Sequence, residues 1–221
     1  MAKRVLVMTA VDAEKDAVLR GIRGDSRFEV LAAGVGPIAA AVSTATALAS
    51  AMVTPDSGYD LVVSAGIGGG FPNQADIGTI VVANEVIAAD LGVQTLDGFS
   101  SIDELGFGTS RLPVAADLSS RLVEALRSGV LTVNYGPILT LSTATGTAIT
   151  ASELTARIPG AAAEAMEGFG VAAAAHSRSI PFIEIRAISN IVGPRDRASW
   201  RIGEALAALE AASTHLSEVF S

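Results

Sequence analysis

Five segments of the sequence place polar side chains or glycines where a ligand could bind. Four of them, Thr9–Glu14, Gly34–Gly36, Gly66–Gly70 and Arg186–Asn190, directly follow apolar runs, and the fifth, Met166–Glu167, begins an alanine-rich helical pattern. Ligands bind beyond the carboxyl ends of the strands in open α/β sheets, so these segments form the candidate site. The carboxylates of Glu14 and Glu167 can take a proton from water or accept hydrogen bonds from hydroxyl groups.

Each of these signals is weak when it is taken alone. Glu14 could be a solvated first-turn glutamate that the helix dipole favours. The glycines could form tight turns between strands and helices, or a dinucleotide-binding loop. A dinucleotide site needs Gly-x-Gly-x-x-Gly after the first strand and an acidic residue about 20 residues later. No glycine follows the first apolar run, and no recognisable acid follows Gly34–Gly36, so a dehydrogenase is disfavoured.

The composition limits the class of protein. Half of the 221 residues are hydrophobic, 17% are charged, and the formal net charge is −8, which disfavours nucleic acid and anionic membranes as partners. The chain has no cysteine and two histidines, so we expect no metal and no cofactor. Val5–Met8 is too short for the apolar region of a signal peptide, and no apolar stretch is long enough to span a membrane. We therefore expect a cytoplasmic protein.

Apolar runs that alternate with alanine-rich helical patterns must position the site. They predict one domain over residues 1–221, a three-layer α/β/α sandwich around a mixed, mainly parallel sheet. The predicted strands are Arg4–Thr9, Phe28–Ala32, Asp60–Ser64, Gly78–Ala88, Val133–Leu141 and Phe182–Ile188. The predicted helices are Asp12–Arg23, Pro37–Met52, Ala115–Arg127, Ala151–Arg157, Ala163–Ser177 and Ser199–Val219. Leu91–Pro113 breaks the periodicity and predicts an exposed loop at a rim or a subunit contact.

The order and spacing of five motifs resemble the nucleoside phosphorylase superfamily, specifically the nucleosidase branch that contains 5′-methylthioadenosine/S-adenosylhomocysteine nucleosidase. These motifs are Ala10–Glu14, Ala33–Gly36, Ala65–Gly69, Ala165–Gly168 and Arg186–Ser189. The resemblance covers nearly the whole chain, and its most specific part is the tail Ile188–Arg197 together with Trp200. That tail looks like the version in one family of the branch, whose substrate is inosine with a carboxyphenyl ketone extension on its 5′ side.

The resemblance implies a purine nucleosidase that works without a cofactor, as a homodimer or a larger homo-oligomer. It makes Glu14 the general base that activates water, Arg186 a residue that helps to hold this water, and Asn190 a residue at the purine edge. It also implies that the purine nucleoside substrate is bound by Ile67, Gly68, Gly69, Met166, Glu167 and Ser189. Cleavage of an N-ribosidic bond builds positive charge on the ribose and negative charge on the base, so a carboxylate beside the sugar suits the reaction.

Asn190 departs from the related adenine-specific nucleosidases, which place an aspartate at this position. An amide NH₂ can donate to the O6 of a 6-oxopurine, while its carbonyl accepts from a protonated N7. Asn190 therefore favours a hypoxanthine base over adenine. An asparagine cannot act as an acid at neutral pH, so the proton for the departing base must come from water or from another group.

Hydrolysis is favoured over phosphorolysis because the sequence offers no phosphate cradle. The segment after the first strand, Ala10–Asp12, has neither glycine nor a basic residue, and Glu14 would repel phosphate. Three alternatives stay open at this point. They are a 5′-methylthioadenosine/S-adenosylhomocysteine nucleosidase, a phosphorylase and a non-catalytic purine nucleoside sensor.

Overall fold

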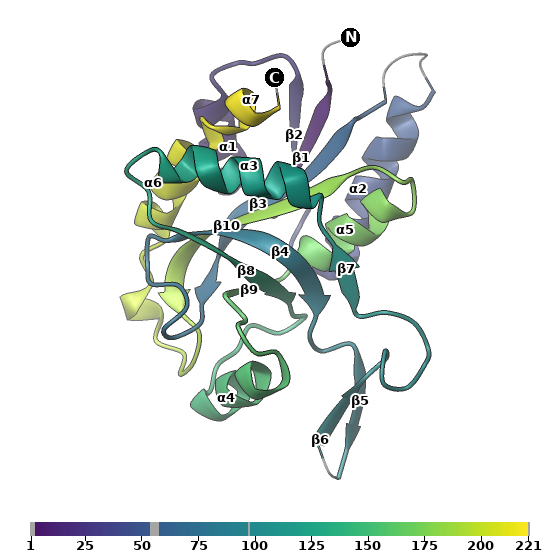
Figure 1. The fold of residues 1–221 in the computed structure, drawn as a ribbon, viewed down its shortest axis with the longest axis vertical. Coiled ribbons are helices and arrows are strands. Elements are labelled where there is room, and N and C mark those ends of the chain that lie inside the picture. Colours follow the sequence, from purple (N-terminus) through teal and green to yellow (C-terminus); the bar gives the residue numbers. More distant parts are fainter. Residues whose placement is uncertain (1–2, 54–57, 97, 221) are drawn as a thin grey trace.

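The computed structural model describes residues 3–53, 58–96 and 98–220 (Figure 1). Within these ranges eight strands form one sheet, and two more form a separate hairpin. The strands are β1 (Val5–Thr9), β2 (Phe28–Ala32), β3 (Leu61–Gly70), β4 (Ile80–Ala88), β5 (Gly92–Thr95), β6 (Gly98–Ser101), β7 (Arg111–Pro113), β8 (Val133–Thr140), β9 (Ala163–Ala165) and β10 (Phe182–Ile191). The helices are α1 (Asp12–Ile22), α2 (Pro37–Ala51), α3 (Ala116–Arg127), α4 (Ala148–Arg157), α5 (Gly168–His176), the 3₁₀ helix η1 (Arg197–Ser199), α6 (Ile202–Ser213) and α7 (Leu216–Val219).

The large sheet closes on itself at one end. The strand order is β10-β4-β8-β9-β3-β1-β2, with β7 paired to β4, and β10 also pairs with β3. Strands β3, β9, β8, β4 and β10 therefore form a closed ring, and β1 and β2 extend the sheet beyond it. The pairs β1–β2, β1–β3, β3–β10, β4–β8 and β8–β9 are parallel, whereas β4–β10, β3–β9 and β4–β7 are antiparallel.

Helices cover both faces of the sheet (Figure 1). Apolar side chains of α1, α3, α6 and α7 pack on one face in a core that includes Val63 and Ile185. On the other face, side chains of α2 and α5 pack around Val62 and Ile188. The predicted three-layer sandwich around a mixed, mainly parallel sheet is thereby confirmed. No helix in the described part of the chain is long and apolar enough to cross a membrane.

The turn into α2 shows how local sequence places a polar group for the site. Pro37 occupies the first turn of α2, where its fixed φ suits the helix and its missing N–H costs nothing. Gly36, directly before it, has a φ of 94°, a conformation that residues with a Cβ rarely adopt. This backbone turns the N–H of Gly36 toward Glu167 on a distant part of the chain, at 3.2 Å from Oε1.

Most predicted elements are confirmed to within a few residues, but the helix over Ala163–Ser177 is wrong at its beginning. Ala163–Ala165 is strand β9, which pairs with both β8 and β3, and the helix begins only at Gly168. A short alanine-rich run that is buried all round carries no periodicity that separates a strand from a helix.

Two segments predicted to lie beyond strands belong to the strands themselves. Gly66–Gly70 is the second half of β3, and Ser189 and Asn190 lie within β10. The glycines stay extended because β10 and β9 hydrogen-bond to them from both sides, and glycine lets other groups approach the backbone closely.

Two further predictions need correction. The helix predicted over Ser199–Val219 is broken into η1, α6 and α7, because Trp200 is extended and the chain turns at Thr214. Leu91–Pro113 is not a plain loop, since it contains the β5–β6 hairpin and β7, which pairs with β4. Residue 97 of this segment lies outside the described residues. The hairpin projects from the sheet, in agreement with the predicted rim position (Figure 1).

Candidate active site

Glu14 lies in the first turn of α1, and its carboxylate is buried rather than solvated. The residue is only 3% exposed. Its Oε2 accepts hydrogen bonds from the backbone N–H groups of Ala10 (2.8 Å) and Val11 (3.3 Å), and its Oε1 accepts one from Ile67 of β3 (2.8 Å). The reading of Glu14 as a solvated first-turn glutamate is wrong. Three backbone donors hold the carboxylate in one orientation at the end of two neighbouring strands.

Arg186 on β10 joins the acidic groups of the site. It is 1% exposed, and its guanidinium donates to three side chains. Nε lies 2.8 Å from Glu184 Oε1, Nη2 lies 2.9 Å from Ser64 Oγ, and Nη1 lies 3.2 Å from Glu167 Oε2. Nη1 also lies 3.4 Å from the carbonyl oxygen of Ile67, the residue whose N–H binds Glu14.

Glu167 is brought to this cluster from the N-cap of α5. The residue is 6% exposed, and besides Arg186 its carboxylate accepts hydrogen bonds from the backbone N–H groups of Gly36 (3.2 Å) and Met166 (3.3 Å). The structure thus brings Glu14, Arg186 and Glu167 together from three distant parts of the chain. Met166 and Ile67 lie beside them, half-buried.

The buried carboxylates of the site surround one cation, the guanidinium of Arg186. Burial lowers the pKa of Arg186, but the carboxylates of Glu184, Glu167 and Glu14 outweigh burial and raise that pKa above its ordinary value. Arg186 therefore stays charged. Burial raises the pKa of Glu184, and the neighbouring Arg186 opposes this rise. A carboxylate that is buried this deeply needs such a partner, because an unpaired charge in an apolar interior is very costly.

Gly66 is the point where Glu14 and Arg186 meet. A Cβ on Gly66 would lie 2.6 Å from Glu14 Oε1 and 2.6 Å from Arg186 Nη1. Only glycine leaves room for both groups at once. This explains why the strand carries a glycine directly after its apolar run.

The superfamily resemblance makes Glu14 the general base. On that expectation Gly66→Ala should lower kcat/KM by more than about a hundredfold, because displacing a reacting group by about 1 Å can cost that much. Steady-state base release by the purified variant checks this. Gly203→Ala is the matched control, because a Cβ there meets no heavy atom within 4 Å, and it should retain activity. Wild-type rates for Gly66→Ala would contradict the geometry described above.

Asn190 and Ser189 form a second polar group on β10. Ser189 Oγ donates to Asn190 Oδ1 (2.9 Å) and lies 3.2 Å from the carbonyl oxygen of Gly68, while Asn190 Nδ2 donates to the carbonyl of Ile191 (3.3 Å). A bulge between Ile188 and Asn190 aligns Asn190 with Gly69 of β3. Asn190 therefore lies next to Gly69, three residues along β3 from Gly66, the residue with which Arg186 is aligned.

The sequence analysis missed three polar residues of this region: Ser64, Glu164 and Glu184. Each stands in an otherwise apolar run, which is a signal that could have revealed it. Glu164 is 6% exposed, and its Oε1 accepts a hydrogen bond from the backbone N–H of Thr145 (2.9 Å). Within the described residues, the second oxygen of Glu164 has no hydrogen-bond partner.

A cleft of about 880 Å³ opens between the β5–β6 hairpin and α4. Its lining includes Thr143, Ala144, Thr145 and Gly146, which lie between β8 and α4. Ligand pockets commonly have volumes of about 300 to 1,000 Å³, so the cleft is large enough for a nucleoside. Thr145 connects the cleft to Glu164, and Glu164 in turn adjoins Gly69.

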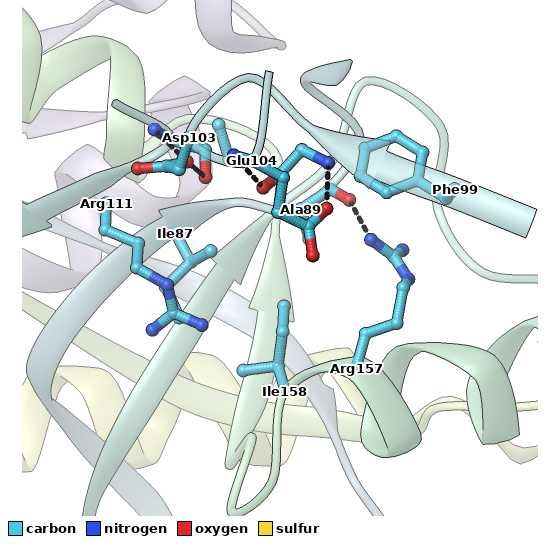
Figure 2. Close-up of a pocket in the computed structure, with 11 residues that line it drawn as sticks. Ile87, Ala89, Phe99, Asp103, Glu104, Arg111, Arg157 and Ile158 are labelled. Atoms are coloured by element: carbon cyan, nitrogen blue, oxygen red, sulfur yellow. Dashed lines mark hydrogen bonds between the residues drawn. The ribbon is translucent and has the colours of Figure 1, made fainter. Parts of the chain in front are cut away.

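A smaller pocket of about 320 Å³ lies on the other side of the hairpin (Figure 2). Phe99 and Arg157 line both pockets, and the guanidinium carbon of Arg157 lies 4.2 Å from the centre of the Phe99 ring. None of the predicted site residues lines either of these two pockets. The floor of the smaller pocket is apolar, with Ile87, Ala89 and Ile158.

The chain resembles known proteins in family, sequence and fold. The family model of the phosphorylase superfamily matches residues 15–221. The chain is 50% identical to a futalosine hydrolase from Streptomyces coelicolor, over 97% of this chain and 95% of that protein. It is 42% identical to one from Acidothermus cellulolyticus, over 95% and 88% of the two chains.

Solved structures share the fold. A 5′-methylthioadenosine/S-adenosylhomocysteine nucleosidase from Colwellia psychrerythraea, solved with adenine, has a TM-score of 0.82 and 22% identity, covering 99% of this chain and 95% of that one. The futalosine hydrolases are the family that the tail Ile188–Arg197 with Trp200 resembles. The chain belongs to the phosphorylase superfamily and, within it, to the futalosine hydrolase family.

Proposed function

We propose that the protein hydrolyses the N-ribosidic bond of futalosine and releases hypoxanthine and dehypoxanthine futalosine. The resemblance places this reaction in menaquinone biosynthesis. The observation that carries the proposal is the buried cluster in which the carboxylates of Glu14 and Glu167 flank the guanidinium of Arg186. Half of the aligned residues are identical to those of a futalosine hydrolase over nearly the full chain, which supports this substrate.

Glu14 is the general base in this proposal. It takes a proton from a water molecule while the water oxygen attacks C1′ of the ribose, and its charge favours the positively charged ring of the transition state. Arg186 helps to hold the water. Its Nη1 and Oε1 of Glu14 both lie 2.6 Å from the position that a Cβ on Gly66 would take, so the two groups lie close to each other beside this glycine.

Glu167 binds the sugar in this proposal. An ionised carboxylate offers two acceptor oxygens, which suits the 2′ and 3′ hydroxyls of a ribose. The hydrogen bonds from Gly36, Met166 and Arg186 fix its orientation. Oε1 accepts only the bond from Gly36 and keeps a free lone pair for a hydroxyl, whereas Oε2 already accepts bonds from both Met166 and Arg186. Met166 packs against the sugar beside it, and Ile67, Gly68 and Gly69 line the ribose and the base.

Water rather than phosphate is the proposed nucleophile. A phosphate cradle uses backbone N–H groups at the start of a helix. At the start of α1 the N–H groups of Ala10 and Val11 already bind Glu14, as does that of Ile67. A phosphate ion would meet a carboxylate in place of free donors.

Asn190 is proposed to hold the O6 and N7 edge of hypoxanthine, with Ser189 fixing its amide. Ser189 donates to the carbonyl oxygen of Asn190, which still has one free lone pair. In the folded chain Asn190 is half-buried beside Gly69. Because Gly69 has no Cβ, a base can approach Asn190 from that side.

Asn190→Asp is expected to reduce hypoxanthine release from futalosine by about tenfold to a hundredfold, because a carboxylate cannot donate to O6 and an unpaired buried group costs about 1 to 3 kcal/mol. Adenine release from 5′-methylthioadenosine should rise in the same variant. Chromatography of the released bases measures both effects. Asn84→Asp, at an exposed asparagine of β4, should change neither. An unchanged ratio of the two bases in Asn190→Asp would show that Asn190 does not select the purine.

The 5′ carboxyphenyl group calls for an apolar slot that ends near a cation. Arg195, Arg197 and Arg201 are the candidates from the sequence, and Trp200 and Phe71 are the candidate stacking partners. Arg195 stacks on Trp200, with its guanidinium carbon 5.4 Å from the ring centre. The backbone N–H of Arg195 donates to the carbonyl oxygen of Gly146, which lines the cleft. Arg201 forms an ion pair with Glu204. Phe71 is 0% exposed in the core, so we withdraw it as a stacking partner. Arg195 with Trp200 is the pair that we propose for the carboxyphenyl group.

We also propose that the protein is a cytoplasmic homodimer or a larger homo-oligomer. Helix α2 presents Ile38 and Val42, 80% and 62% exposed, one turn apart on its outer side, and Val35 before the helix is 57% exposed. Exposed apolar side chains that adjoin one another are typical of a protein contact. The small residues of α2 allow a second chain to approach closely.

One experiment tests the proposed function directly. The purified protein is incubated without phosphate or metal with futalosine, inosine and 5′-methylthioadenosine, and the released bases are identified. Hypoxanthine from futalosine is expected as the main product. Adenine as the main product would show a methylthioadenosine nucleosidase instead, a strict need for phosphate would show a phosphorylase, and binding without turnover would show a nucleoside sensor.

A further inference from the structure

The proposed hydrolysis leaves one chemical need unmet. The electron pair of the broken C1′–N9 bond goes to the base, and a purine leaves much faster when one of its ring nitrogens is protonated at the same time. Glu14 acts as a base, Asn190 has no proton to give at neutral pH, and Arg186 stays charged. The proton must therefore come from water or from a separate acid beside the base.

Glu164 is positioned beside the base site by the pairing of three strands. Gly69 of β3 is aligned with Glu164 of β9 on one side and with Asn190 of β10 on the other. Residues aligned across neighbouring strands direct their side chains to the same face of the sheet. A Cβ on Gly69 would lie 3.4 Å from Glu164 Cγ and 3.3 Å from Asn190 Nδ2. Glu164 and Asn190 thus lie on either side of Gly69, where Val192 Cγ2 also packs, 2.9 Å from the same Cβ position.

The surroundings of Glu164 are polar but only partly satisfied. Its Oε1 accepts a hydrogen bond from Thr145 N, whereas its Oε2 and the hydroxyl of Thr145 have no partner in the part of the chain that the structure describes. Buried polar atoms are rarely left unpaired in a folded protein. Two such atoms on neighbouring residues, one of which lines the cleft, point to a polar ligand at this place.

The charge state of Glu164 suits an acid. Burial raises its pKa, and the hydrogen bond from Thr145 opposes this rise only in part. The groups that face it from the neighbouring elements, Thr145 before α4, Gly69 of β3 and Asn190 of β10, are all uncharged. Among residues 3–53, 58–96 and 98–220 no cation forms an ion pair with its carboxylate, in contrast to Glu184 and Glu167, which both bind Arg186.

We propose that Glu164 is the catalytic acid that protonates the departing base. This inference rests on the proposed nucleosidase function. As the C1′–N9 bond breaks and its electron pair moves into the base, the proton of the Glu164 carboxyl passes to N7, and hypoxanthine leaves neutral. Asn190 binds O6 on the same edge and accepts a hydrogen bond from the new N7–H. Water adds to C1′ and gives its proton to Glu14. The proton on Glu14 then returns to Glu164 through solvent, so the enzyme is regenerated.

A comparison of leaving groups tests this role. 4-Nitrophenyl β-D-riboside releases a group that is stable as an anion and needs no acid, whereas hypoxanthine needs one. Glu164→Gln is expected to lower kcat on futalosine by about 10²- to 10⁴-fold, the usual contribution of a general acid. On the nitrophenyl riboside its loss should be at least tenfold smaller, a difference that damage to the fold would not produce.

Glu184→Gln is the matched control. Glu184 is also a buried glutamate with a raised pKa and one unpartnered oxygen among the described residues, but it contacts Arg186 and not the base site. Its replacement should slow both substrates by similar factors. If Glu164→Gln also slows both substrates equally, or leaves futalosine hydrolysis intact, Glu164 is not the acid.

The wild-type protein supplies a second measurement in case Glu164→Gln does not fold. The rate on futalosine should fall as the pH rises through the raised pKa of Glu164, because the acid loses its proton, while the rate on the nitrophenyl riboside should not fall there. Identical alkaline limbs for both substrates would overturn the inference. A wild-type protein that releases no hypoxanthine from futalosine would instead overturn the proposed function, so the two failures are distinguishable.

Discussion

Glu14→Gln is expected to lower kcat for futalosine hydrolysis by about 10²- to 10⁴-fold, the range over which a positioned general base accelerates a reaction. Glutamine has nearly the same shape, so its amide oxygen can still accept on one side. Its NH₂ cannot accept, so either Ile67 or the pair Ala10 and Val11 loses its hydrogen-bond partner. Its amide cannot take a proton from water, and it carries no charge to stabilise the positively charged ribose. Release of hypoxanthine under saturating substrate measures the loss.

A neighbouring residue provides the control for this change. Asp12 lies in the same first turn of α1, but it is exposed. Asp12→Asn removes the same charge from the same helix end and should leave kcat within about twofold, since its effect is limited to the helix dipole, worth about 0.3 to 1 kcal/mol for stability. Substrate affinity of Glu14→Gln should also change much less than kcat. Comparable losses in both variants would mean that the helix end, and not the carboxylate of Glu14, is what matters.

Arg186→Met is expected to destabilise the protein by about 3 to 5 kcal/mol, the cost of leaving a buried ion-pair partner uncompensated. The methionine fills part of the space but leaves the fully buried Glu184 and the 6% exposed Glu167 without their cation. Urea unfolding measures the change in the free energy of unfolding. Arg111→Met is the matched control. Arg111 pairs with Glu85 at the surface, where both side chains are at least one-third exposed, so its loss should cost less than about 1 kcal/mol.

The pH dependence of the Arg186→Met variant has a defined sign. Burial already raises the pKa of Glu184, and Arg186 is the group that opposes this rise. Without Arg186 the folded-state pKa rises further above the unfolded value. The variant should then be most stable, relative to the wild-type protein, at pH values below the pKa that Glu184 has in the unfolded chain. It should lose stability as the pH rises through the pKa that Glu184 has in the folded protein.

The double variant Arg186→Met with Glu184→Gln checks the cause. Removing the charge of Glu184 should recover part of the lost stability and weaken the pH dependence. If the double variant is no more stable than Arg186→Met, the uncompensated carboxylate of Glu184 is not the reason for the loss.

Local sequence patterns were enough for the layers of the fold and for part of the site. Apolar runs typical of strands alternate with alanine-rich patterns typical of helices. The period and the length of each pattern depend on whether the element is buried on one face or on both. Glu14, Glu167 and Arg186 could be selected because they stand at the ends of such runs, where ligands bind in α/β sheets. The assigned roles of these residues remain predictions, but the structure brings the three side chains together.

What local patterns could not decide is how distant segments share one sheet. β9 looks helical in isolation and is a strand only because β8 and β3 lie on either side of it. Gly66 and Gly69 look like a turn, yet they are strand residues whose missing side chains make room for Glu14, Arg186, Asn190 and Glu164. The chain alone determines which residues are apolar, charged or without a side chain. Which carboxylate meets the guanidinium of Arg186, and which one stays unpaired beside Asn190, is decided by the pairing of strands from opposite ends of the chain, because burial and charge pairing exist only after those strands have met.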